Sequence, residues 1–296
     1  MRFLKLAFCS IALIGVSAAV SATSDLTATS ASVVILIAPK NDAQAPPNTK
    51  DLVVRDNREP VQVNELRPLK DEPLLFSVLV DASGSMYPRV SQENAVAIGI
   101  FKGLSKPGRQ GHLYEFADIS SRSKDVLEAF GAERSLDESR RGATVLYDAI
   151  DQAVTQQLAL RRTNQMSRQA IVVLSDGDDN LSQTTFSGAL AELQRADIPL
   201  FAVHIPTPID TSYPYGKRDA KAALEHFRKL SHETGGAMVE LDGHRDSVSE
   251  IIAAIDSQYM LTIAIQSSNA NALHKLEVKC TSGNFVVTAP TLYVPQ

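Results

Sequence analysis

Short apolar runs alternate with segments of helical period along the central part of the chain. The run at 171–174 is continuously apolar, as expected for a parallel strand that is buried on both faces. Apolar residues within 146–158 and 220–230 recur at steps of three and four, which predicts helices with one buried face. Ser247 and Glu250 form a capping-box pair, which predicts that a further helix starts with Ser247 as its cap. The predicted strands are 75–80, 112–116, 170–174, 199–204 and 237–241.

This alternation predicts one α/β domain over residues 74–257, with a doubly wound, mostly parallel central sheet and helices on both faces. The flanking segments have no helical period. Residues 51–73 are typical of a β-hairpin, and 258–296 contain short strands separated by turns. Residues 23–50 contain a β-branched strand and a Pro-rich connector, which either join the flanking strands or form an independent linker. We expect the flanking strands of both ends to form a small accessory β unit.

Residues 1–22 are typical of a secretory signal peptide. Arg2 and Lys5 precede the apolar run 6–16, and residues 20–22 fit the cleavage pattern that a signal peptidase reads. The run is shorter than the roughly 20 residues that span a bilayer, and no later apolar segment reaches that length. We therefore expect an exported protein, secreted or periplasmic, without an integral membrane segment after cleavage. An uncleaved membrane anchor is the alternative.

Charge and cysteine content exclude further classes of protein. The 29 Lys and Arg residues stand against 34 Asp and Glu residues, giving a formal charge of -5, which argues against a nucleic-acid partner. The chain has two cysteines, and signal removal would leave Cys280 alone. One cysteine cannot form an internal disulfide, so stability must come from core packing or bound ions.

Polar residues directly follow two of the predicted strands. Asp81, Ser83 and Ser85 come after the strand at 75–80, and Asp176 comes soon after 170–174. Ligands of open α/β sheets bind at the carboxyl ends of the strands. Two carboxylates that meet there repel one another and need a cation or a raised pKa. Oxygen ligands suit a hard divalent ion, of which magnesium is the first choice.

A third oxygen source is Thr144, which precedes a predicted helix on a loop that faces the strand ends. The three segments, Asp81-x-Ser83-x-Ser85, Gly142-Ala143-Thr144 and Ser175-Asp176-Gly177, together resemble the metal-ion-dependent adhesion site of the von Willebrand factor type A domain. Residues 52–58, 234–236 and 258–259 extend this resemblance to exported von Willebrand factor A-related proteins of Acidobacteria.

The resemblance implies that Ser83, Ser85 and Thr144 bind Mg²⁺ or Mn²⁺ directly, while Asp81 and Asp176 bind it directly or through water. It also implies that a protein partner supplies an Asp or Glu carboxylate to the remaining coordination position. The expected function is therefore that of a bacterial, non-catalytic adhesion or interaction module.

Two other interpretations use the same residues. The ion could be purely structural, pinning loops together without a role in partner binding. A magnesium-dependent phosphohydrolase of the haloacid dehalogenase type also places Asp after its first strand. That enzyme class needs a second Asp two positions later, where this chain has Ser83, and its second-motif hydroxyl ends a strand, whereas Thr144 opens a helix.

Overall fold

The computed structural model describes residues 29–40, 47–117, 127–129, 143–164, 168–207, 220–242, 246–265 and 272–295. The predicted signal peptide, residues 1–22, lies outside these ranges. Within them, no helix combines the length and the apolar character needed to cross a bilayer.

The centre of the molecule is a six-stranded sheet with the order β10-β9-β8-β5-β6-β7. Its first five strands are parallel, and β7 is antiparallel to β6 at one edge. β5 lies between β6 and β8. The strands β6 and β7 extend the sheet on one side of β5, and β8, β9 and β10 extend it on the other. The strands are β5 (Leu74–Asp81), β6 (Arg109–Phe116), β7 (Leu127–Ala129), β8 (Arg168–Ser175), β9 (Leu200–His204) and β10 (Met238–Glu240).

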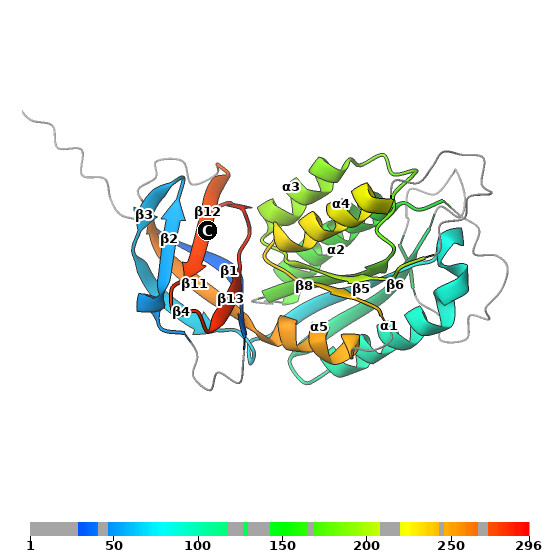
Figure 1. Ribbon diagram of the computed structural model, residues 1–296, viewed down its shortest axis with the longest axis horizontal. Coiled ribbons are helices and arrows are strands. Elements are labelled where there is room, and N and C mark those ends of the chain that lie inside the picture. Colours follow the sequence, from blue (N-terminus) through cyan, green and yellow to red (C-terminus); the bar gives the residue numbers. More distant parts are fainter. Residues whose placement is uncertain are drawn as a thin grey trace, which may run out of the picture.

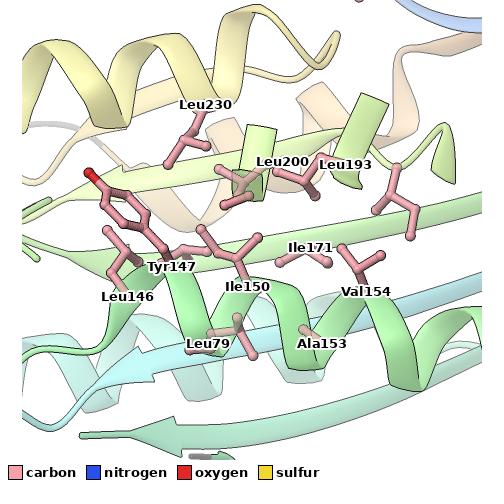
Figure 2. Close-up of a cluster of buried hydrophobic side chains, with 14 of the residues drawn as sticks. Leu79, Leu146, Tyr147, Ile150, Ala153, Val154, Ile171, Leu193, Leu200 and Leu230 are labelled. Atoms are coloured by element: carbon pink, nitrogen blue, oxygen red, sulfur yellow. The ribbon is translucent and has the colours of Figure 1, made fainter. Parts of the chain in front are cut away.

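Helices cover both faces of this sheet, which confirms the predicted doubly wound α/β fold. One face carries α1 (Val90–Leu104) and α5 (Ser247–Asp256), and the other carries α2 (Leu146–Asn164), α3 (Phe186–Ala196) and α4 (Ala220–His232) (Figure 1). Alternate strand residues serve the two cores. Leu79 and Ile171 pack with α2, α3 and α4 (Figure 2), whereas Val78 and Val172 pack with α1 and α5. This two-sided burial explains the continuously apolar strand at 171–174.

The start of α5 differs from the predicted capping box. Ser247 is the first helical residue, and Asp246 is the cap. The Asp246 carboxylate accepts hydrogen bonds from the backbone amide of Ser249 at 3.1 Å and from its hydroxyl at 2.6 Å. An aspartate cap also places a negative charge at the positive end of the helix dipole, so Asp246 displaces Ser247 from the capping position.

The flanking segments form two four-stranded antiparallel sheets, β13-β1-β11-β4 and β14-β12-β2-β3. A separate apolar core lies between them. β1 pairs with β11 from Thr29 opposite Ile265 to Leu36 opposite Gln258, and its other edge pairs with β13. The two ends of the chain therefore build one accessory β unit, as predicted. Its strands are β1 (Thr29–Pro39), β2 (Leu52–Asp56), β3 (Glu59–Val61), β4 (Val63–Pro68), β11 (Gln258–Ile265), β12 (His274–Cys280), β13 (Phe285–Thr288) and β14 (Leu292–Tyr293).

The accessory β unit contacts the α/β unit at the amino ends of the parallel strands (Figure 1). Arg168, at the start of β8, is buried and donates hydrogen bonds to Ile255 O at 3.2 Å and Gln258 Oε1 at 3.3 Å. Beside it, Arg109 pairs with Asp256 at 2.6 Å. From Leu74 to the far end of β5 the strand extends about 23 Å. The carboxyl edge of the sheet therefore lies well away from the accessory β unit.

Candidate metal centre

Asp81 and Asp176 lie at the carboxyl edge of the sheet, Asp81 as the last residue of β5 and Asp176 directly after the neighbouring strand β8. The register pairs Val80 with Leu174, which places Asp81 beside Ser175. Ser175 Oγ donates a hydrogen bond to Asp81 Oδ2 at 2.6 Å in a buried environment. The strands that follow β5 are added first on one side of it and then on the other. The carboxyl end of β5 is therefore the topological switch point of the sheet, where α/β folds bind ligands.

The turn after β5 gathers three of the predicted oxygen ligands. The backbone amide of Ser83 donates to Asp81 Oδ1 at 2.9 Å, which fixes the carboxylate over its own turn. The hydroxyl oxygens of Ser83 and Ser85 lie 3.1 Å apart. Ser83 precedes the short 3₁₀ helix Gly84–Arg89, but its hydroxyl makes no capping bond to that helix. Asp81 and Ser83 are buried and Ser85 is half-buried.

Asp176 begins the loop that follows β8, and both of its oxygens accept hydrogen bonds. Oδ1 accepts from the backbone amide of Asp178 at 3.1 Å, and Oδ2 accepts from the hydroxyl of Thr207 at 2.9 Å. Gly177 adopts a φ of 81°, and a Cβ atom there would lie 3.0 Å from Phe227 Cβ. This turn therefore requires glycine. Asp176 is buried like Asp81.

Thr144 reaches the same edge from a third segment. Its backbone amide donates to Asn180 Oδ1 at 2.9 Å, and its carbonyl accepts from the amides of Asn180 at 3.2 Å and Leu181 at 3.1 Å. Thr144 is buried and lies two residues before the start of α2. These bonds tie it to the loop that starts at Asp176, so all three predicted segments meet at one edge.

The electrostatics of Asp81 favour a cation. Burial, and then the charge of Asp176, raise the pKa of Asp81 to about 7, although the hydrogen bonds from Ser175 and Ser83 act in the opposite direction. In the part of the chain that the structure describes, the hydrogen-bond partners of Asp81 are neutral donors. A positive ion beside both carboxylates would reverse this shift.

The donor set fits a hard divalent ion. The described residues contain no group of three or more His, Cys, Asp or Glu side chains placed to hold a metal. A centre at this edge would thus depend on two carboxylates and the hydroxyls of Ser83, Ser85 and Thr144. Such an all-oxygen set suits Mg²⁺ or Mn²⁺, which prefer hard ligands, and does not suit zinc or copper.

The structure adds supporting residues that the motif did not include. Thr207, in the loop after β9, holds Asp176, and Ser175 holds Asp81. Asp179 accepts from the Tyr147 amide at 3.2 Å and the Ser182 hydroxyl at 2.5 Å, so it braces the loop against the start of α2. Ser175 adjoins a motif residue and could be found from sequence. Thr207 lies 31 residues from Asp176, and only the adjacency of β8 and β9 reveals it.

No protein-family model matches the sequence, and no curated protein matches it. Solved structures that are similar to the chain include BatB from Bacteroides thetaiotaomicron, at 16% identity over 62% of this chain and 97% of that one, with a TM-score of 0.42. The VWA domain of SpRpn10 shows 18% identity over 60% of this chain and 93% of its own, with a TM-score of 0.38.

A third solved structure is the von Willebrand factor type A protein from Catenulispora acidiphila. It is 12% identical over 90% of this chain and 74% of its own, with a TM-score of 0.41. The structural neighbours of this chain thus include von Willebrand factor type A domains, and these likenesses concern the fold alone.

Proposed function

We propose that this chain is an exported, non-catalytic interaction protein of the von Willebrand factor A type. Mg²⁺ or Mn²⁺ is held by Asp81, Ser83, Ser85, Thr144 and Asp176, and a protein partner adds an Asp or Glu carboxylate. The supporting observation is the meeting of two buried carboxylates and three hydroxyl-bearing residues, from three distant segments, at the switch point of the sheet.

Charge explains why such a centre could accept an acidic partner. Two carboxylates balance a divalent ion, and the three hydroxyls add ligands without adding charge. A third carboxylate can then approach without strong repulsion, and five protein ligands leave one position of an octahedral ion for it. The bound ion would supply a Lewis-acidic anchor, while the protein residues fix where that anchor lies.

Two features support this function over the phosphohydrolase interpretation. Ser83 occupies the position of the second Asp, and its hydroxyl lies against that of Ser85, 3.1 Å away. Thr144 lies on a loop ahead of α2 and does not end a strand. The chain therefore presents the Ser83 hydroxyl where that enzyme class requires a proton-transferring carboxylate, and its Thr144 hydroxyl comes from a different kind of element.

Metal binding is tested by calorimetric titration of the purified protein with MgCl₂ and MnCl₂. Wild type should bind one ion, and Asp81→Ala and Thr144→Ala should each weaken binding at least about tenfold. Asp246→Ala removes the exposed carboxylate that caps α5 and is the matched control, with unchanged Mg²⁺ affinity expected. Circular dichroism checks folding, and wild-type affinity in Asp81→Ala would contradict the proposed centre.

The accessibility of the ion is tested with Mn²⁺ and water-proton relaxation. A bound Mn²⁺ that keeps an exchangeable water should enhance relaxation, and free acetate should reduce that enhancement by competing for the same position. A structural ion with a filled shell would stabilise the protein without enhancement. That result would favour the structural interpretation over partner binding.

Export is proposed from the sequence of residues 1–22 and has its own test. Expression in a bacterial host with an intact secretion pathway should release a chain whose amino terminus is Thr23. Detection of residues 1–22 on the membrane-associated protein would instead favour an uncleaved anchor.

A further inference from the structure

Large apolar side chains are exposed at two places in the part of the chain that the structure describes. Val53 on β2 and Val286 on β13 are 46% and 47% exposed, and both belong to the accessory β unit. Tyr87 and Leu181 are 55% and 53% exposed, and both belong to segments that carry candidate metal ligands. Single exposed apolar residues are common, so the placement of the second pair is what matters.

Tyr87 is held at a fixed place relative to the candidate ligands. It lies within the 3₁₀ helix Gly84–Arg89, two residues after Ser85. Met86, beside it, is fully buried, and its amide donates to Ser83 O at 3.2 Å. The buried neighbour anchors the turn, so the exposed Tyr87 lies on a fixed segment, two residues from the candidate ligand Ser85.

Leu181 is fixed through a different segment, the one that carries Thr144. Its amide donates to Thr144 O at 3.1 Å. The residues that follow it are also held, because the Asp148 carboxylate accepts from the amides of Gln183 at 2.9 Å and Thr184 at 2.8 Å. An exposed leucine on a loop with this many bonds loses little conformational freedom when a partner covers it.

We propose that Tyr87 and Leu181 are apolar contacts that flank the metal-bound carboxylate, so that the partner is a protein segment whose acidic residue has apolar neighbours. The inference rests on the proposed function, because the ion supplies the acidic anchor. The anchor alone would accept any accessible Asp or Glu. Apolar contacts on both sides would select among them, because covering exposed apolar surface is favourable only for a matching partner.

The test uses two labelled synthetic peptides of equal length and charge. Each has one Asp, flanked by Leu and Phe in the first peptide and by Ser on both sides in the second. Fluorescence anisotropy is measured with the full chain in Mg²⁺ and in EDTA. The apolar-flanked peptide should bind about tenfold more tightly in Mg²⁺ than the serine-flanked peptide, and EDTA should abolish binding of both.

Tyr87→Ser and Leu181→Ser should each weaken the apolar-flanked peptide about five- to tenfold and leave the serine-flanked peptide unchanged. Val53→Ser and Val286→Ser remove apolar side chains of similar exposure from the accessory β unit and are the matched controls, with no effect expected. Calorimetry with MgCl₂ should give wild-type affinity for all four variants, which excludes an indirect effect through the ion.

The outcomes separate this inference from the function on which it rests. Equal binding of both peptides, lost in EDTA and insensitive to Tyr87→Ser and Leu181→Ser, would overturn the inference and leave carboxylate capture intact. Binding that survives EDTA, or no binding of either peptide to the Mg²⁺-loaded protein, would overturn both.

Discussion

Two buried aspartates, one in each unit of the molecule, end a strand in different surroundings. Asp56 ends β2 in the accessory β unit, where His274 Nδ1 lies 2.9 Å from both carboxylate oxygens and the Tyr293 hydroxyl donates to Oδ1 at 3.0 Å. Asp81 ends β5, where its donors are the Ser175 hydroxyl at 2.6 Å and the Ser83 amide at 2.9 Å.

The difference is in how the negative charge is balanced. The imidazole of His274 lies against both oxygens of Asp56, and burial, followed by the charge of Asp56, raises the pKa of Tyr293, so its phenol remains a donor. Asp81 instead faces Asp176, and this raises its pKa to about 7 together with burial. A carboxylate balanced within the protein joins strands together, whereas one with neutral donors and a like-charged neighbour calls for an external cation.

The largest effect should come from breaking the balanced site. Asp56→Ala leaves His274 and Tyr293 buried without their shared acceptor, so we expect a loss of about 3–5 kcal/mol in the free energy of unfolding. Urea denaturation measures it, and Mg²⁺ affinity should stay at the wild-type value. A loss of Mg²⁺ binding in a folded Asp56→Ala protein would mean that the two aspartates are not independent.

In EDTA at pH 8, Asp81→Asn should instead increase the free energy of unfolding. The folded pKa of Asp81, about 7, is above its ordinary value of 3.8, so the folded state binds this proton more tightly than the unfolded state. Its contribution to stability is therefore full below about pH 4 and is lost as the pH rises to about 7. At about 1.4 kcal/mol per pKa unit, the loss amounts to several kcal/mol, which Asp81→Asn should recover at pH 8.

The measurement is the free energy of unfolding of both proteins between pH 4 and pH 8. Burial also raises the pKa of Asp197 to about 7, so a similar slope is present in both proteins and cancels in their difference. Mg²⁺ should stabilise wild type more at pH 8 than at pH 5 and should not stabilise Asp81→Asn. A pH-independent difference between the two proteins would be inconsistent with this account of Asp81.

Thr207→Val tests the supporting residue of the second carboxylate. Loss of the hydroxyl that donates to Asp176 Oδ2 frees that carboxylate to reorient. We expect a decrease of about 10- to 100-fold in Mg²⁺ affinity, as for other residues that orient metal ligands. Thr207→Ser keeps the hydroxyl and should restore most of the affinity, and an equal loss in both variants would show that the methyl group matters instead.

The smallest effect should come from Tyr293→Phe, which removes one of the donors to Asp56 and keeps His274. We expect a loss of about 1.5–3 kcal/mol in the free energy of unfolding, which is typical of a hydrogen bond to a charged group. Denaturation in urea is again the measurement. A loss as large as that of Asp56→Ala would mean that the Tyr293 phenol provides most of the stabilisation of Asp56.

Features that depend on neighbouring residues could be predicted from the sequence. The apolar run at 171–174 gave the buried strand β8, and the spacing within 81–85 gave a turn that gathers oxygens. Alternation of strands and helices was sufficient for the doubly wound fold, because each unit of it reflects local periodicity.

Several features that depend on contacts or competition between residues could not be predicted. The antiparallel edge strand β7 depends on its pairing with β6. The cap of α5 depends on which of two adjacent residues, Asp246 or Ser247, takes the capping position. His274 shows no ligand spacing in the sequence, yet it meets Asp56 across 218 positions. Such pairings follow from sheet register, which spacing along the chain does not reveal.

The position of β1 has a consequence for biosynthesis. This eleven-residue strand is made early, but its partners β11 and β13 are made late, and Ser32 meets Thr262 across 230 positions. Until those partners are synthesised, the backbone N–H and C=O groups along both edges of β1 are unpaired and its apolar side chains are uncovered, which favours aggregation and proteolysis. A nascent or truncated chain ending before residue 258 should therefore be a substrate for chaperones and proteases, even with its central sheet already folded.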